Sequence, residues 1–190
     1  MFDTDLAPGL LLAMPQLQDP HFSRAVVLMV EHNDEGSMGL IINQPSEVTA
    51  VELLEHLQMP WRGSPTELVF AGGPVRPNTG WVLHQPMAEL EPRPQRGSNT
   101  IEVSPGISLT NSPDRLRTIA GAPPRWFRLL LGYAGWGPGQ LAEEMAEGAW
   151  LHAAVSPEIV FATPADRIWD VAVRSLGISP DAVVVSRGVN

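Results

Sequence analysis

Four glycines within eight positions, from Gly132 to Gly139, place the strongest constraint on how this chain can fold. Glycine is favoured where the backbone adopts conformations that other residues avoid, or where another group comes very close. The apolar run Trp126–Leu131 precedes these glycines with the composition of a strand, and Gln140–Met145 follows with that of a helix. The sequence therefore predicts a tight connection from a strand to a helix at Gly132–Leu141.

Two interpretations of this connection are open. A glycine-rich turn before a helix can bind an anion, because free backbone N–H groups point at the ligand. The run lacks the Gly-Lys-Ser/Thr of a P-loop, and Glu143 and Glu144 early in the helix would repel an anion. We therefore favour a structural corner in which Trp136 covers the sheet. The residues of this corner that stay candidates for ligand binding are Gly135, Trp136, Gly139 and Gln140.

The chain has 190 residues, and its 19 prolines and 17 glycines are spread along the whole length. This length suits one domain with its own core, and we expect a single domain over residues 1–190. Frequent prolines and glycines favour many short elements over a helical bundle. Because the chain has no cysteine, disulfides and cysteine-bound zinc are excluded.

Short strand-like runs make up most of the predicted elements. Arg24–Glu31 and Met38–Asn43 are nearly continuous apolar runs joined by Asn33–Gly36, which predicts a β-hairpin covered on both faces. Gly72-Gly73-Pro74 is expected to link two further strands as a pair, and residues 86–98 are expected to form an exposed loop. The remaining predicted strands are Gly9–Met14, Leu68–Ala71, Trp81–His84, Ile101–Val103, Ile107–Thr110 and Glu158–Phe161.

Three helices have clear start signals. Thr49 and Glu52 have the spacing of a capping box. Ser112-Pro113-Asp114 and Thr163-Pro164 combine a capping side chain with proline in the first turn, and the last helix is expected to end at Gly177. Because strands outnumber helices and hairpins mix with strand–helix steps, we predict an α+β fold with largely antiparallel pairing.

Four segments, in this order, resemble the YqgE/AlgH family of bacterial proteins. They are Ala13-Met14-Pro15 with Asp19–Phe22, Glu31–Pro45, Phe70–Val75 with Gly80–His84, and Gly132–Leu141. The resemblance spans nearly the whole chain. It implies a cytosolic protein of one domain with a bifurcated, mostly antiparallel β-sheet that forms a pseudo-barrel flanked by helices. It brings no catalytic residues, because the family has no established reaction, and the AlgH branch implies a role in the regulation of gene expression.

The sequence departs from the family's pattern at three places. Arg24-Ala25 stands where the family often has a small residue, and Gln44 where it often has a basic one. The last residues, 186–190, lack the usual Gly-His-Ala ending. A chemistry that relies on that basic residue and that histidine is therefore not expected in this chain.

The net charge of −9 is unevenly distributed. Residues 1–59 contain one arginine and nine acids, whereas residues 60–130 contain eight arginines and five acids. The overall charge disfavours duplex nucleic acid, because phosphate neutralisation supplies most of that affinity, but the arginine-rich middle keeps nucleic acid open as a partner. Trp61 and Trp81 lie in that segment and are the tryptophans to test for base stacking. No signal peptide or membrane-spanning run is visible, so we expect a cytoplasmic protein without a membrane partner.

Polar residues at the ends of predicted strands form the second candidate site. His32, Asn43, Gly72, Gly73 and His84 would form a polar pocket if they met at one rim of the sheet. The alternative, which we favour, is that these polar side chains bond the backbone of nearby turns. No Gly-x-Ser-x-Gly or His-Glu-x-x-His motif is present, and we expect neither a metal nor a cofactor.

These observations favour a non-enzymatic cytosolic protein that binds a protein or small-molecule partner. Two alternatives stay open. One is a small hydrolase-like enzyme with its site at the rim of His32, Asn43, Gly72 and His84. The other is a nucleic-acid-binding regulator that uses the arginine-rich middle segment.

Overall fold

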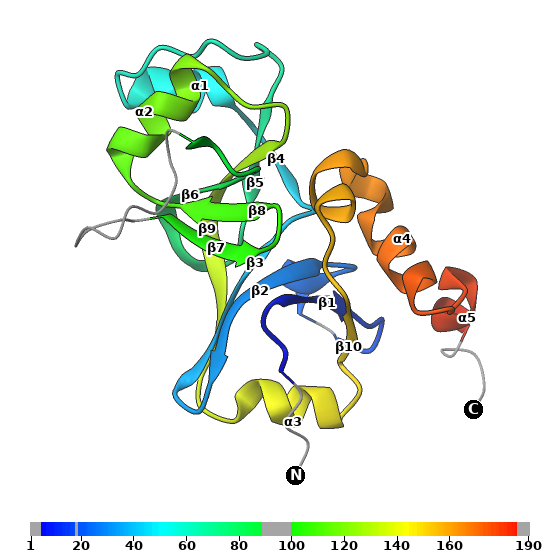
Figure 1. The fold of residues 1–190 in the computed structure, drawn as a ribbon. Coiled ribbons are helices and arrows are strands. Elements are labelled where there is room, and N and C mark those ends of the chain that lie inside the picture. The colour runs from blue at the N-terminus through cyan, green and yellow to red at the C-terminus, as the bar shows by residue number, and fades with distance from the viewer. Residues whose placement is uncertain (1–4, 18, 89–99, 186–190) are drawn as a thin grey trace.

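The computed structural model describes residues 5–17, 19–88 and 100–185 (Figure 1). The strands are β1 Gly9–Ala13, β2 Val26–Asn33, β3 Gly36–Ile41, β4 Pro45–Thr49, β5 Leu68–Ala71, β6 Val75–His84, β7 Thr100–Ser104, β8 Ile107–Thr110, β9 Phe127–Trp136 and β10 Trp150–Ala153. The α-helices are α1 Ala50–His56, α2 Pro113–Gly121, α3 Gln140–Ala146, α4 Ile168–Ser175 and α5 Pro180–Val185. Short 3₁₀ turns cover Pro20–Phe22 and Ala165–Arg167.

The sheet has the order β10-β1-β2-β3-β9-β6-β8-β7, and β5 joins it at β9 with β4 alongside. It divides at β9, which pairs with β3 over its last three residues and with β6 and β5 over the residues up to Tyr133. Among the described strands, only the β5–β9 pairing is parallel. The predicted α+β class with a bifurcated, mostly antiparallel sheet is confirmed. Because β10 and β7 do not pair with each other, the pseudo-barrel is not closed.

Helices cover both faces of the sheet, as the two apolar strands of the hairpin predict. In β2, Val26 and Leu28 face a core that includes Trp169 of α4. Val27 and Met29 face the opposite core, which is closed by Leu141 of α3. Figure 1 shows α1 and α2 together at the far end of the molecule from α3. The capping box of Thr49 and Glu52 is present at α1, with both of its hydrogen bonds.

Three glycines lie against one another where the link after β5 crosses β9. The N–H of Gly72 donates to the carbonyl of Leu131 at 2.7 Å. A Cβ atom added at Gly72 would approach the carbonyl oxygen of Gly132 to less than 3.0 Å, and one at Gly73 would collide with the backbone of Tyr133. The predicted pairing of the two strands around this link is wrong, because β5 and β6 each pair with β9 and not with each other.

The connection predicted at Gly132–Leu141 is shorter than expected. Strand β9 continues through Gly132 to Trp136, so only Gly137-Pro138-Gly139 forms the turn into α3. Gly132 and Gly139 have φ values of +75° and +76°, the left-handed region that favours glycine. Glycine at position 132 therefore permits the close approach of the Gly72-Gly73 backbone. Glycine at position 139 permits the turn immediately before α3.

The segment Glu158–Phe161, predicted as a strand, forms a π-helix over Glu158–Ala162. The N–H of Thr163 donates to the carbonyl of Glu158 at 3.1 Å, the five-residue spacing of that helix. The buried guanidinium of Arg128 donates to the carbonyls of Val160 and Thr163 at 2.7 and 3.3 Å. A short apolar run does not distinguish a strand from a buried helical turn, and here contacts distant in sequence decide. No described helix is long and apolar enough to cross a membrane.

Candidate functional site

The polar residues of the second candidate site are separated by the sheet. His84 lies opposite Phe127, the first residue of β9. His32 lies opposite Ser37, which in turn lies opposite Trp136, the last residue of β9. Nine strand positions, at about 3.3 Å each, place the two histidines roughly 30 Å apart along β9. His32 and His84 therefore do not share a rim, which was the less favoured of the two interpretations.

Asn43 and the two glycines of that set bond or pack against nearby backbone. The side-chain oxygen of Asn43 accepts from the N–H of Val26 at 2.8 Å, and its nitrogen donates to the carbonyl of Arg24 at 2.9 Å. Gly72 and Gly73 pack directly against the backbone of β9. These contacts fix the backbone around Arg24 and Val26. Both the oxygen and the nitrogen of the Asn43 side chain are used in them.

His84 is the most buried histidine, with 1% of its surface exposed. Its Nδ1 lies 2.7 Å from the carbonyl oxygen of Gln85, which places the proton on Nδ1 when the ring is neutral. Its Nε2 is buried and has no hydrogen-bond partner. Burial lowers the pKa of His84, and the positive charge of Arg115 lowers it further, against the opposing effect of the bond to Gln85. The ring is therefore neutral near pH 7.

The residues of the glycine-rich connection have two different roles. Gln140 bridges the turn, because its side-chain oxygen accepts from the N–H of Gly137 at 3.1 Å and its nitrogen donates to Glu144 at 2.9 Å. Gly139 is the residue before α3. Gly135 and Trp136, in contrast, line a surface cleft. The structure thus separates the candidates at Gly139 and Gln140 from those at Gly135 and Trp136.

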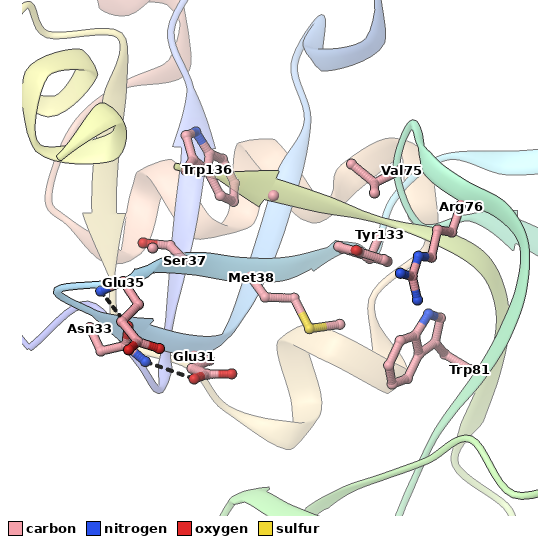
Figure 2. Close-up of a pocket in the computed structure, with 12 residues that line it drawn as sticks. Glu31, Asn33, Glu35, Ser37, Met38, Val75, Arg76, Trp81, Tyr133 and Trp136 are labelled. Carbon is pink, nitrogen blue, oxygen red and sulfur yellow. Dashed lines mark hydrogen bonds between the residues drawn. The ribbon is translucent and has the colours of Figure 1, made fainter. Parts of the chain in front are cut away.

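This cleft, of about 510 Å³, lies between the β2–β3 hairpin, β9 and the start of β6 (Figure 2). Its size is that of a small-ligand site. Side chains at the cleft belong to four strands and the hairpin turn. The lining residues are Glu31, Asn33, Glu35, Gly36, Ser37, Met38, Val75, Arg76, Trp81, Tyr133, Gly135 and Trp136. We call it the hairpin cleft.

The floor of the hairpin cleft follows from strand alternation. Met38 lies opposite Gly135, and Tyr133 is on the same face of β9 two residues earlier. Because Gly135 has no side chain, the floor is open there: an added Cβ would find its nearest atom, in the Tyr133 ring, at 3.5 Å. The side chain of Trp136 points to the opposite face, where it packs in the core with α3. Trp136 therefore lines the cleft with its backbone.

Arg76 forms one end of the hairpin cleft. Val75 lies opposite Tyr133 and Gly80 opposite Leu131, so residues 76–79 leave the ladder as a bulge. Arg76 begins this bulge with a φ of +45°, a conformation that costs about 1–2 kcal/mol for a residue with a side chain. Its side chain is exposed and makes no ion pair with any described residue. Figure 2 shows its guanidinium beside the indole nitrogen of Trp81.

Trp81 presents an unused hydrogen-bond donor at the same end. Its ring packs edge to face on Tyr133, with centroids 6.2 Å apart and planes at 84°. The indole Nε1 is buried and has no hydrogen-bond partner. Leaving such a donor unsatisfied costs about 1–3 kcal/mol. A ligand acceptor that displaced the groups covering this nitrogen would remove that cost, and it would meet the positive charge of Arg76 as well.

Acidic side chains form the other end of the hairpin cleft. The side-chain nitrogen of Asn33 donates to Glu31 at 2.7 Å, and its oxygen accepts from the N–H of Glu35 at 2.8 Å. Asn33 thereby holds the Glu31 carboxylate in place. Figure 2 shows Glu31 and Glu35 on the opposite side of Met38 from Arg76. The hairpin cleft is thus positive at one end, negative at the other and apolar between.

Sequence reasoning identified only part of this site. Gly135 and Trp136 were candidates, and Trp81 was singled out for stacking. Arg76, Tyr133 and Glu31 were missed, although the alternation of Tyr133 and Gly135 along a strand would have placed both on one face. The structure brings together no group of three or more histidine, aspartate or glutamate side chains suited to a metal ion within the described ranges.

The chain is similar to a set of bacterial proteins without an assigned reaction. The family profile described as AlgH-like, DUF179, matches residues 10–181. A UPF0301 protein of Myxococcus xanthus is 42% identical over 187 residues, covering 98% of this chain and 99% of that protein. A UPF0301 protein of Photobacterium profundum is 40% identical, covering 97% of this chain and 98% of that protein.

Two solved structures have the same fold. The solution structure of the AlgH protein from Pseudomonas aeruginosa matches with a TM-score of 0.76 and 34% identity, covering all of this chain and 98% of that one. A crystal structure of a protein from Corynebacterium diphtheriae matches with a TM-score of 0.67 and 22% identity over 89% of this chain and 86% of that one. The second likeness concerns the fold alone.

Proposed function

The chain belongs to the AlgH-like family, and we propose that it acts by binding a ligand in the hairpin cleft and not by catalysis. The observation that carries this proposal is the pairing of two unused donors at one end of the cleft. Arg76 has no ionic partner among the described residues, and the buried N–H of Trp81 has no acceptor. Together they suit a carboxylate or another anionic group with a lone pair to share.

The contact that most resembles a catalytic pair supports an enzyme poorly. His32 Nδ1 lies 2.7 Å from the hydroxyl oxygen of Ser37. Strand alternation places these two side chains on the face opposite to Met38 and Glu31, so Ser37 lines the hairpin cleft with its backbone, as Trp136 does. No described acidic group bonds the remaining nitrogen of His32, which a nucleophile–base–acid arrangement requires.

The arginines of the middle segment give the nucleic-acid alternative little support. Arg128 is buried against backbone carbonyls. Arg117 pairs with Asp114, and Arg125 lies over the ring of Trp126. These side chains occupy different elements and do not line one groove with Arg76. We propose a cytoplasmic binding protein whose regulatory effect, if it shares the one implied for the AlgH branch, depends on occupancy of the hairpin cleft.

The test is a thermal-shift and calorimetric screen with N-acetyl-leucine, indole-3-acetate, inorganic phosphate and a dinucleotide. We expect the two apolar carboxylates to bind and to raise the melting temperature. Trp81→Phe, which keeps an aromatic ring but removes the N–H, and Arg76→Gln should each weaken binding at least tenfold. Trp126→Phe and Arg125→Gln, outside the hairpin cleft, are the matched controls.

Two results would overturn the proposal. One is binding that survives unchanged in both Trp81→Phe and Arg76→Gln. The other is turnover on a phosphatase, esterase and nuclease panel that disappears on substitution of His32, because that would place catalysis on the other face of the hairpin.

A further inference from the structure

We propose that the ligand of the hairpin cleft is a short, extended peptide with opposite charges at its two ends. The anionic end would lie at Arg76 and Trp81, and the cationic end at Glu31 and Glu35. This inference rests on the proposed binding function and specifies its ligand. It follows from three features of the cleft: its polarity, its length and its floor.

The polarity of the hairpin cleft favours a dipolar ligand over a polyanion. Glu31 and Glu35 lie in the same cleft as Arg76, and the whole chain has a net charge of −9. A nucleotide or another polyanion would be attracted to Arg76 but repelled by both carboxylates and by the overall field. A dipolar ligand of zero net charge meets complementary charge at both ends.

The length of the hairpin cleft matches a peptide of about four residues. Glu31 is on β2 and Arg76 on β6, and β3 and β9 lie between them. Three strand spacings of about 4.8 Å place the backbones of the two ends roughly 14 Å apart. An extended peptide of four residues spans up to about 14 Å.

The floor between the two ends suits the middle of such a peptide. Met38 and Tyr133 present a flexible thioether and an aromatic ring, which pack against apolar side chains of varied shape. Gly135 leaves the peptide backbone room to approach the sheet. We therefore expect aliphatic residues at the central positions of the ligand.

The test uses calorimetry with the tetrapeptide Ala-Leu-Leu-Ala, its N-acetylated form and its C-amidated form, at low salt. We expect the free peptide to bind best, and either modification to weaken binding about tenfold. The double variant Glu31→Gln with Glu35→Gln should weaken the free peptide by the same factor and leave the acetylated peptide unchanged. Glu143→Gln, an exposed acid on α3, is the control.

A second variant tests the location without touching a charge. Gly135→Leu places a side chain in the open floor, where backbone geometry and space permit it, and should abolish binding of all three peptides. Unchanged melting temperatures of the variants would show that the fold is intact.

The outcomes separate this inference from the function on which it rests. If free and acetylated peptides bind equally and both require Arg76 and Trp81, the dipolar ligand is wrong while the binding site stands. The dipolar ligand is also wrong, and the binding site again stands, if no peptide binds but the apolar carboxylates do. If binding is indifferent to Arg76→Gln, Trp81→Phe and Gly135→Leu, both proposals fail.

Discussion

Trp136 and Trp150 donate their indole N–H groups to the same carboxylate oxygen, Oε2 of Glu144, at 3.0 and 2.7 Å. Their rings meet edge to face with centroids 5.8 Å apart. Both indoles are buried, so α3 supplies the acceptor that lets two tryptophans from different strands enter one core. Glu144, considered from the sequence only as a charge that would repel an anion, thus accepts hydrogen bonds from two core tryptophans.

Replacing Glu144 should therefore destabilise the protein strongly. Glu144→Ala leaves two buried donors without acceptors, at about 1–3 kcal/mol each, and we expect a loss of about 2–5 kcal/mol in the free energy of unfolding. Urea denaturation measures this loss. The exposed neighbour Glu143→Ala is the control and should change stability by less than about 0.5 kcal/mol. Equal effects of the two substitutions would contradict the role assigned to Glu144.

The close contact of Gly72 and Gly73 with Gly132 predicts that alanine substitution lowers stability strongly at one glycine and hardly at all at another. Gly132→Ala combines a positive φ, costing about 1–2 kcal/mol, with overlap between the new Cβ and the carbonyl of Gly73, and we expect a total loss above about 3 kcal/mol. Gly80 has no atom within 4 Å of an added Cβ, so Gly80→Ala should cost less than about 1 kcal/mol. Melting temperatures of the two variants measure the difference, and similar values would refute the crossing.

Arg24 occupies a strained position that its side chain helps to hold. Its φ is +51°, its guanidinium lies 4.5 Å from the ring centre of Trp169, and it pairs with Asp170. Arg24→Ala and Arg24→Gly both remove these contacts, but only glycine relieves the strain. We expect Arg24→Gly to be about 1 kcal/mol more stable than Arg24→Ala in chemical denaturation. The reverse order would show that the backbone is not strained at this position.

The buried His84 predicts that stability falls in mild acid. Burial lowers its pKa in the folded state below the ordinary value of 6.5, so below that pH the unfolded chain binds a proton that the folded chain excludes. Stability is therefore full above about pH 6.5 and falls toward lower pH, by at most about 1.4 kcal/mol per pH unit for one group. His152, whose pKa burial also lowers, adds to this effect.

Unfolding measured between pH 7.5 and 5.5 tests this prediction. His84→Asn keeps a donor for the carbonyl of Gln85 and removes the titration, so the pH dependence should become shallower. An unchanged slope in His84→Asn would show that His84 is not responsible for the acid sensitivity.

Features that depend on neighbours in sequence could be predicted. The hairpin of β2 and β3 follows from two apolar runs around Asn33–Gly36, and the start of α1 from the spacing of Thr49 and Glu52. The family could be assigned from four motifs in order. The glycines in two of these motifs, Gly72-Gly73 and Gly132, could be recognised as a backbone requirement, but not as the two halves of one contact.

The α+β class, the hairpin, the capped helix and the family could all be read from the chain, because each is encoded by residues close together or by motif order. Which functional side chains lie close together could not be read from the chain, because it depends on how distant strands pair. Folding separated His32 from His84 and gathered Glu31, Arg76 and Trp81 into one cleft. Strand β9 pairs with β3, β5 and β6, which are all distant from it in sequence, and such long-range pairing sets which side chains share a face.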